Sequence, residues 1–349
     1  MSIYLLIIDL LSEWYAYCMN NTQELFLLRL SMQLSSLNMH QCISESYLHS
    51  NILTDWKLTY DQLSAGTFES FLREISFDGI QVYEERFKPS MFQRGEAKSN
   101  SLCLGFFSEM AAPALWMGKQ IIGHEILSVC NQDEILLRSP ENCSFYSLTV
   151  PFELLDDHEF DQHYSKCSNV IADQYAEIYH KKFLTLLDHV LNNAHFIVNN
   201  ATKQQLKSDI LDLSNSFIQV LNQHQEAKKI SCQRAKQVVM KVSDILESDK
   251  DKCYSIEDLC QMTFTSRRTL QNCFEQMTGQ SPALFLKKLK LNAVRRTLLN
   301  ADESVTVSDA ATEWGFWHLS QFAVDYKKFF GESPSQTLMH KHAKRVLFS

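Results

Sequence analysis

The side chains with the clearest chemical capacity in this sequence are those that can hydrogen-bond to the edges of DNA bases. A short run near the C-terminus is rich in them: Arg267, Arg268, Thr269, Gln271 and Asn272. Arginine pairs bidentately with guanine, and asparagine or glutamine with adenine, and each good pair contributes roughly 1–3 kcal/mol of discrimination. A run of this composition predicts DNA reading if a helix holds it on an exposed face.

Residues suited to catalysis or metal binding do not form a recognisable pattern. The sequence contains no GxSxG, P-loop or GxGxxG motif. His124 stands alone in a strand-like region, without a His-x-His pair and a glutamate at metal-ligand spacing. Cys253, Cys260 and Cys273 lack a paired histidine set. We therefore expect no enzyme activity, no catalytic residue, no metal site and no cofactor.

An internal repeat supplies the elements that must position the base-reading run. The pattern Leu-x3-Phe-x4-Gly-x-Ser-Pro at 270–282 recurs at 322–334, with Phe and Tyr in the first two places. Ser-Ile-Glu-Asp at 255–258 likewise recurs as Thr-Val-Ser-Asp at 306–309. The second copy has one extra residue in its turn.

Each copy predicts a short helix, a turn and a second helix. Ser255 and Thr306 are suited to cap a helix N-terminus, and Gly279 and Gly331 are suited to end the second helix. The Ser-Pro that follows each glycine starts the next helix with proline at its first position. This is the helix-turn-helix unit, whose second helix enters the major groove. The repeat therefore predicts two such units in tandem.

Residues 283–300 between the units predict one continuous helix. Eighteen residues at about 1.5 Å each give a rigid spacer of about 27 Å, which brings the two second helices within range of the ~34 Å repeat of one DNA turn. The basic residues of this spacer are Lys287, Lys288, Lys290, Arg295 and Arg296. They either contact phosphates or form a solvated face.

The chain ahead of the repeat shows two other patterns. From 61 to 150, short runs alternate apolar and polar residues, and Asp78-Gly79 between two of them is a strong hairpin signal. Such runs predict a β-sandwich or small barrel, whose interior holds either a ligand or its own side chains. From 152 to 225, apolar residues recur every three or four positions, which predicts helices that pack on the sandwich or on a second copy of the chain.

The expected fold class is α+β, with an N-terminal β-sandwich or barrel, a helical segment and an all-α C-terminal domain. The expected boundaries are 1–60 for an uncertain N-terminal segment, 61–170 for the β domain, 171–229 for the helical segment and linker, and 230–349 for the tandem helix-turn-helix domain. Within the third segment, the polar run 224–229 is the expected domain linker.

Charge and cysteine usage agree with one DNA-contacting domain in a reducing compartment. The net charge is −8, but residues 1–230 carry −12 and residues 231–349 carry +4. The ten cysteines include no CxxC pair, which favours free thiols. The apolar run 1–11 is interrupted by Asp9 and is half the length needed to span a bilayer. We therefore expect a cytoplasmic protein with no membrane association.

The segment 233–343 resembles the AraC/XylS family of bacterial transcription regulators. AATEWGFWHLSQFAVDYKKFFGESPSQTL (310–338) is similar to the family signature, with Gly315, Phe316 and Phe322 at the expected places. SRRTLQNCF (266–274) and LKLNAVRRTLLN (289–300) narrow the resemblance to a subgroup similar to the activator of the ethanolamine-utilisation operon. The C-terminal resemblance covers about a third of the chain.

The resemblance implies a cupin-like N-terminal domain for effector binding or dimerisation, with a helical dimerisation segment. It implies a sequence-specific regulator of transcription, expected to be an activator, that binds double-stranded DNA as a homodimer. RNA polymerase and a small-molecule effector of unknown identity are the further candidate partners. The alternative is a cupin-type ligand-binding protein or enzyme with an incidental helical tail, but such a protein has no use for two reading helices one DNA turn apart.

Matching the family motif assigns the reading positions. Arg268, Gln271 and Asn272 are expected to project toward base edges, whereas Leu319 and Val324 in the second unit can touch only a thymine methyl group. The second unit is therefore expected mostly to position the protein on the DNA and to read few bases. The full expected DNA-contacting set is Ser266, Arg267, Arg268, Thr269, Gln271 and Asn272 in the first unit and Trp317, His318, Leu319, Ser320 and Gln321 in the second.

Overall fold

The computed structural model describes residues 41–339 except 44, 54–55, 131, 157–168, 173, 195–196, 198, 224–232, 251, 253 and 301–303. The expected linker 224–229, most of the uncertain N-terminal segment and Cys253 lie outside the described residues.

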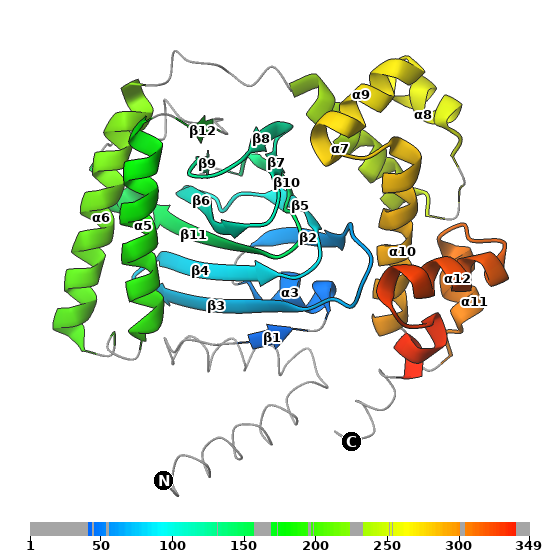
Figure 1. Cartoon of the computed structure of the whole chain (residues 1–349), viewed down its shortest axis with the longest axis horizontal. Helices are drawn as coiled ribbons and strands as arrows, with labels where there is room; N and C mark the ends of the chain where they lie inside the picture. The colour runs from blue at the N-terminus through cyan, green and yellow to red at the C-terminus, as the bar shows by residue number, and fades with distance from the viewer. Residues whose placement is uncertain are drawn as a thin grey trace, which may run out of the picture.

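Two antiparallel sheets face each other in the N-terminal half (Figure 1). The first sheet has the strand order β1 (Gln41–Ile43), β3 (Ser70–Phe77), β4 (Ile80–Phe87), β11 (Cys143–Pro151), β6 (Ser101–Met110), β9 (Ile126–Cys130) and β12 (Asn169–Ile171). The second has the order β2 (Lys57–Gln62), β5 (Met91–Glu96), β10 (Glu134–Arg138), β7 (Ala114–Trp116) and β8 (Lys119–Ile121). Together with α3 (Ser46–Ile52), these sheets are called the β domain below.

The hairpin predicted at Asp78-Gly79 is confirmed. β3 pairs with β4 from Phe77 opposite Ile80 outward, and both turn residues have positive φ, 48° at Asp78 and 83° at Gly79. The β domain begins earlier than residue 61, however. β1 and α3 precede that position, and β2 already starts at Lys57.

The interior between the sheets is filled by the protein's own side chains. Trp56, Tyr83, Trp116 and Phe145 line a remaining cavity of about 30 Å³, which is enough for about two water molecules. The described side chains thus leave little room for a ligand between the sheets in this structure.

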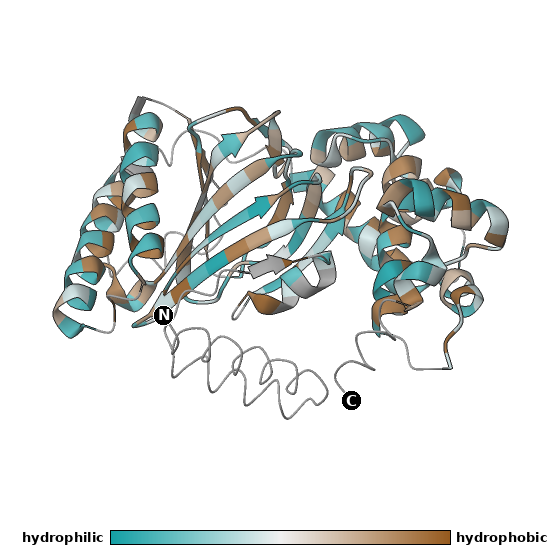
Figure 2. Ribbon diagram, turned by 60° about the horizontal axis from the view of Figure 1, so that its bottom comes forward, coloured by the Kyte–Doolittle hydropathy of each residue, from teal (hydrophilic) through white to brown (hydrophobic). Residues whose placement is uncertain are grey.

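Two long helices cover the outer face of the seven-stranded sheet. α5 (Gln174–Asn192) and α6 (Asn200–Gln223) form an antiparallel pair beside β4 and β11 (Figure 1). Their apolar residues, among them Phe183, Leu187 and Phe217, are fully buried in a cluster shared with the sheet. Hydrophobic and hydrophilic residues consequently alternate around these helices (Figure 2). The helices pack on the chain's own sheet, as one of the two sequence alternatives predicted.

The C-terminal part is helical, with α7 (Gln233–Ser248), α8 (Ile256–Thr263), α9 (Arg267–Thr278), α10 (Pro282–Asn300), α11 (Val307–Glu313) and α12 (Leu319–Phe330). The two predicted helix starts are confirmed: Ser255 with Asp258 and Thr306 with Asp309 form reciprocal capping boxes. Gly279 and Gly331 end α9 and α12 in the left-handed conformation, at φ 70° and 80°.

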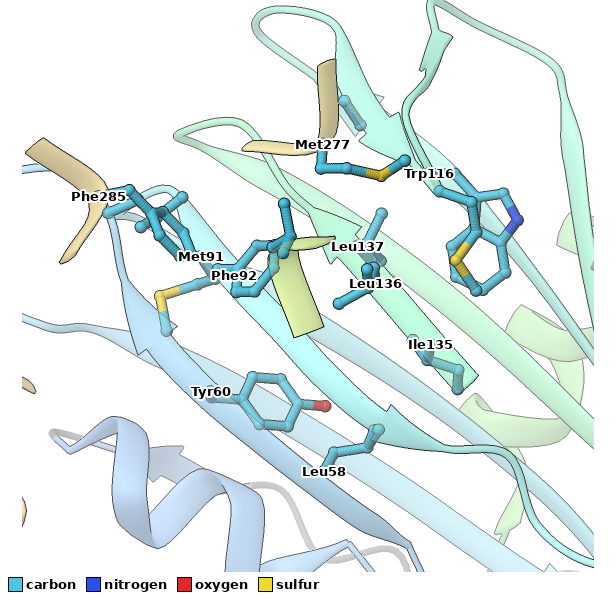
Figure 3. Packing of buried hydrophobic residues seen from close by; sticks show 14 of the residues in the cluster. Leu58, Tyr60, Met91, Phe92, Trp116, Ile135, Leu136, Leu137, Met277 and Phe285 are labelled. Carbon is cyan, nitrogen blue, oxygen red and sulfur yellow. The ribbon is translucent and has the colours of Figure 1, made fainter. Parts of the chain in front are cut away.

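The helical part packs against the five-stranded sheet. One hydrophobic cluster runs from the sheet into α7, α8, α9 and the first half of α10, whereas α11, α12 and the second half of α10 enclose a cluster of their own. Figure 3 shows Phe285 of α10 beside Phe92 and Met91 of β5, and Met277 of α9 near Trp116 of β7. Among the described residues, no helix is both long enough and apolar enough to cross a membrane.

Candidate nucleic-acid interface

The first unit consists of α8, the turn and α9, and α9 is its reading helix. Ser266 caps α9 by accepting a hydrogen bond from the backbone N–H of Thr269. Leu270 and Phe274 are fully buried on the inner face of α9. Because positions three and four apart share a helix face, Arg268, Gln271 and Asn272 lie together on another face.

These polar residues differ in how far they are engaged within the protein. Arg267 is exposed and pairs with Glu257 of α8 at 3.2 Å, and half-buried Gln271 donates a 2.6 Å hydrogen bond to Glu275 Oε1. Arg268 and Asn272 are exposed. Within the described part of the chain, Arg268 has no ion-pair partner, so its guanidinium is available to a base or a phosphate.

The second unit consists of α11, the turn and α12, and it presents a more apolar surface. Trp317 is 62% exposed, and His318, Leu319, Ser320 and Gln321 are exposed around the start of α12. Trp314, by contrast, is buried, and its Nε1 donates to Thr297 Oγ1 at 3.1 Å.

Asp325 of α12 connects the second reading helix to the spacer helix. Lys287 of α10 contacts its carboxylate at 2.7 Å. Burial raises the pKa of Asp325, but hydrogen bonds from Lys287 and Gln321 outweigh burial and the net shift is downward. Gln321 is therefore held partly by its own helix, as Gln271 is in the first unit.

The C-terminal ends of both reading helices contact the β domain, whereas their N-terminal ends are exposed. Gly279 lies against Leu115 of β7, and Gly331 lies against Thr67. The backbone N–H of Gly66 also donates to the carbonyl of Phe329 at 2.8 Å. Equivalent ends of the two repeat copies thus contact the β domain, and the ends that carry the candidate DNA contacts remain free.

The basic residues of α10 overturn both sequence interpretations of that helix. Three of them contact the β domain: Lys288 donates to the carbonyl of Leu63, Arg295 pairs with Glu45, and Arg296 pairs with Asp61. Lys287 and Lys290 bind groups within the helical part, namely Asp325 and the carbonyl of Lys252. These basic side chains are neither a phosphate-binding stripe nor a solvated face, because they bind groups of the protein itself. The β-domain acids that pair with Arg295 and Arg296 are distant in sequence, so the sequence pattern did not reveal them.

Phe264 is a feature that the sequence analysis missed. It occupies the turn of the first unit in the left-handed conformation, at φ 53°, with 86% of its surface exposed and Lys241 Nζ 5.1 Å from its ring centroid. The repeat could have revealed it, because the equivalent position in the second unit is Gly315, at φ 76°.

Comparisons with known proteins find similarity mainly in the helix-turn-helix part of the chain. The pattern of a family described as a helix-turn-helix domain matches residues 259–340. The chain is 35% identical to XylDLEGF operon transcriptional activator 2 of Pseudomonas putida over 103 residues, which are 29% of this chain and 66% of that protein. It is 33% identical to the solved structure of a probable AraC family transcriptional regulator from Rhodopseudomonas palustris CGA009, covering 30% of this chain and 97% of that one, with a TM-score of 0.28.

The helix-turn-helix domain of this chain is that of an AraC/XylS-family transcriptional regulator. A longer but weaker similarity extends into the β domain: XylDLEGF operon transcriptional activator 3 of Pseudomonas putida is 25% identical over 225 residues, 63% of this chain. The match spans 66% of the length of that relative. The AraC/XylS assignment therefore rests on the helix-turn-helix domain.

Proposed function

We propose that this AraC/XylS-family protein is a sequence-specific transcriptional activator that reads successive major grooves with α9 and α12. The observation that carries the proposal is the pair of equivalent reading helices, each with most of its candidate DNA contacts exposed near the N-terminal end and its inner face buried. The names of the relatives, which are operon activators, support the direction of regulation.

The two reading helices have different proposed roles. Arg268 and Asn272 of α9 supply base contacts, because arginine and asparagine carry the donors and acceptors that discriminate bases. The start of α12 positions the protein on the duplex, through contacts of His318, Ser320 and Gln321 that carry less sequence information. DNA-contacting roles for the remaining expected residues, including Trp317, are part of the same proposal.

Control through the N-terminal half is the second part of the proposal. Homodimerisation, contact with RNA polymerase and response to a small effector remain proposals that rest on family resemblance. The 30 Å³ interior cavity is too small for an effector of more than a few atoms without rearrangement of the sheets. The ethanolamine-type resemblance of 266–274 and the XylDLEGF relatives point to different operons, so the proposal names no pathway.

Selection of duplexes from a random-sequence library by the full chain tests the proposed function. A selected duplex should bind with an affinity that decreases linearly on a logarithmic salt scale, as counterion release requires. The control is Lys181→Ala on α5, which removes a positive charge far from the reading helices α9 and α12 and should leave the affinity unchanged. Failure to enrich any sequence over the starting library would refute sequence-specific binding.

A further inference from the structure

We infer that the β domain fixes the position of the second helix-turn-helix unit through a polar latch on α10, and that Glu45 is a positioning residue for DNA recognition. The inference rests on the proposed DNA-reading function. The latch consists of Glu45, Asp61 and Gln62 of the β domain with Asn292, Arg295 and Arg296 of α10.

The first half of α10 is attached to the β domain by apolar packing. Phe285 is fully buried, and its ring meets that of Phe92 edge-on at a centroid distance of 5.0 Å (Figure 3). Leu286 and Leu289 belong to the same cluster, which also contains the core of the first unit. Since separating these surfaces would expose apolar area to water, the first unit and the β domain behave as one body.

The second half of α10 is attached by hydrogen bonds and ion pairs. The Asn292 side chain donates to the Gln62 carbonyl at 2.9 Å and accepts from the Gln62 N–H at 3.0 Å, so it pairs with this edge strand much as another strand would. One residue earlier on β2, Asp61 accepts from Arg296 at 2.5 Å. Such groups are readily solvated when they separate, which distinguishes this half from the first.

The second unit depends on this polar half for its placement. Its hydrophobic core is separate from that of the β domain and the first unit. Its described links to the β domain include the hydrogen bond from Gly66 to Phe329 and the Arg295 ion pairs, which join Glu45 to Glu332 of the segment after α12. The latch therefore adds to the continuous helix α10 in setting where α12 lies relative to α9.

Glu45 is the member of the latch whose substitution best tests the connection between Arg295 and the β domain. It is 14% exposed and accepts 2.8 Å hydrogen bonds from both Nε and Nη2 of Arg295. Without it, Arg295 keeps Glu332 at 2.8 Å, and its guanidinium still lies 4.7 Å from the ring centroid of Phe330. Glu45→Gln thus weakens the connection to the β domain without leaving a buried charge unpaired.

The test uses a duplex selected by the full chain and the same duplex truncated so that it lacks the DNA facing the second unit. For Glu45→Gln we expect about tenfold weaker binding to the intact duplex, within the range of coupling between sites, and less than about twofold change on the truncated one. Asn292→Ala should behave in the same way. Glu69→Gln, which removes an exposed ion pair with Lys88 at 2.9 Å, is the matched control and should change neither affinity.

A spacing series separates positioning from simple stability. Inserting one base pair between the two half-sequences should weaken wild-type binding more than binding by Glu45→Gln, because a unit released from the latch can adjust. Equal losses on intact and truncated duplexes, or unchanged spacing dependence with both latch variants folded, would overturn the inference. Failure of the wild-type chain to bind the intact duplex would instead refute the proposed function.

Discussion

Replacing Phe264 by glycine is expected to stabilise the protein although it removes a large side chain. The left-handed conformation costs an L-residue roughly 1–2 kcal/mol, and glycine adopts it freely. The ring is 86% exposed, so little apolar burial is lost. The contact with Lys241 contributes about 0.5 kcal/mol at an exposed site. Glycine also adds unfolded-state entropy, which leaves a net gain of about 0.5 kcal/mol.

The repeat provides the matched control at the equivalent position. Gly315→Ala places a Cβ at φ 76° and should destabilise the protein by about 1 kcal/mol. Urea unfolding followed by circular dichroism measures both changes as shifts of the midpoint at constant m-value. Phe264→Asn, which tolerates the left-handed region better than phenylalanine, should lie between wild type and glycine.

The two variants must therefore change stability in opposite directions. If Phe264→Gly lowers the midpoint, the phenylalanine ring contributes more packing in solution than its exposure indicates, and the strain argument is wrong. If Gly315→Ala raises the midpoint, the two turns do not share the conformation on which the comparison depends.

Three further predictions concern reading, pH and capping. Arg268→Ala should weaken binding to a selected duplex by roughly 1–3 kcal/mol and relax preference at one base pair, whereas Gln321→Ala should cost less; equal losses in a gel-shift series would contradict this order. Burial lowers the pKa of His180, whose Nε2 donates to the Phe107 carbonyl at 2.8 Å. The unfolded chain therefore binds more protons, and the free energy of unfolding should fall as pH decreases through about 6.5, less so for His180→Gln. Thr306→Ala should cost about 1 kcal/mol by removing the cap of α11, measured by thermal unfolding against the exposed Thr185→Ala.

The helix-turn-helix units could be predicted from sequence because their determinants are local. Capping boxes at Ser255 and Thr306, terminal glycines and the proline that starts α10 each act within a few residues of the feature they specify. The repeat then fixed the register, since two copies of one pattern constrain each other. The same locality explains why the Asp78-Gly79 hairpin was recognised.

The start of the β domain could not be located in the same way. β2 contains Tyr60, which is buried, but also Asp61 and Gln62, which are buried too. Polar residues at these positions give no apolar signal for a buried strand. Asp61 is buried because Arg296, more than 200 residues away, supplies an opposite charge, and the backbone of Gln62 is paired by the side chain of Asn292.

The distribution of charge has a consequence for how this protein achieves specificity. Much of the basic excess of residues 231–349 is neutralised by acids of the β domain: Lys236 pairs with Glu134, Arg295 with Glu45, and Arg296 with Asp61. Among the described residues the number of cations left for phosphate contacts is correspondingly reduced, so we expect fewer counterions to be released on binding and a shallower salt slope. A regulator with a weak electrostatic contribution binds non-specific DNA weakly. The discrimination must then come from the exposed base-reading residues of α9, among which Arg268 offers a guanidinium with no ion-pair partner in the described part of the chain.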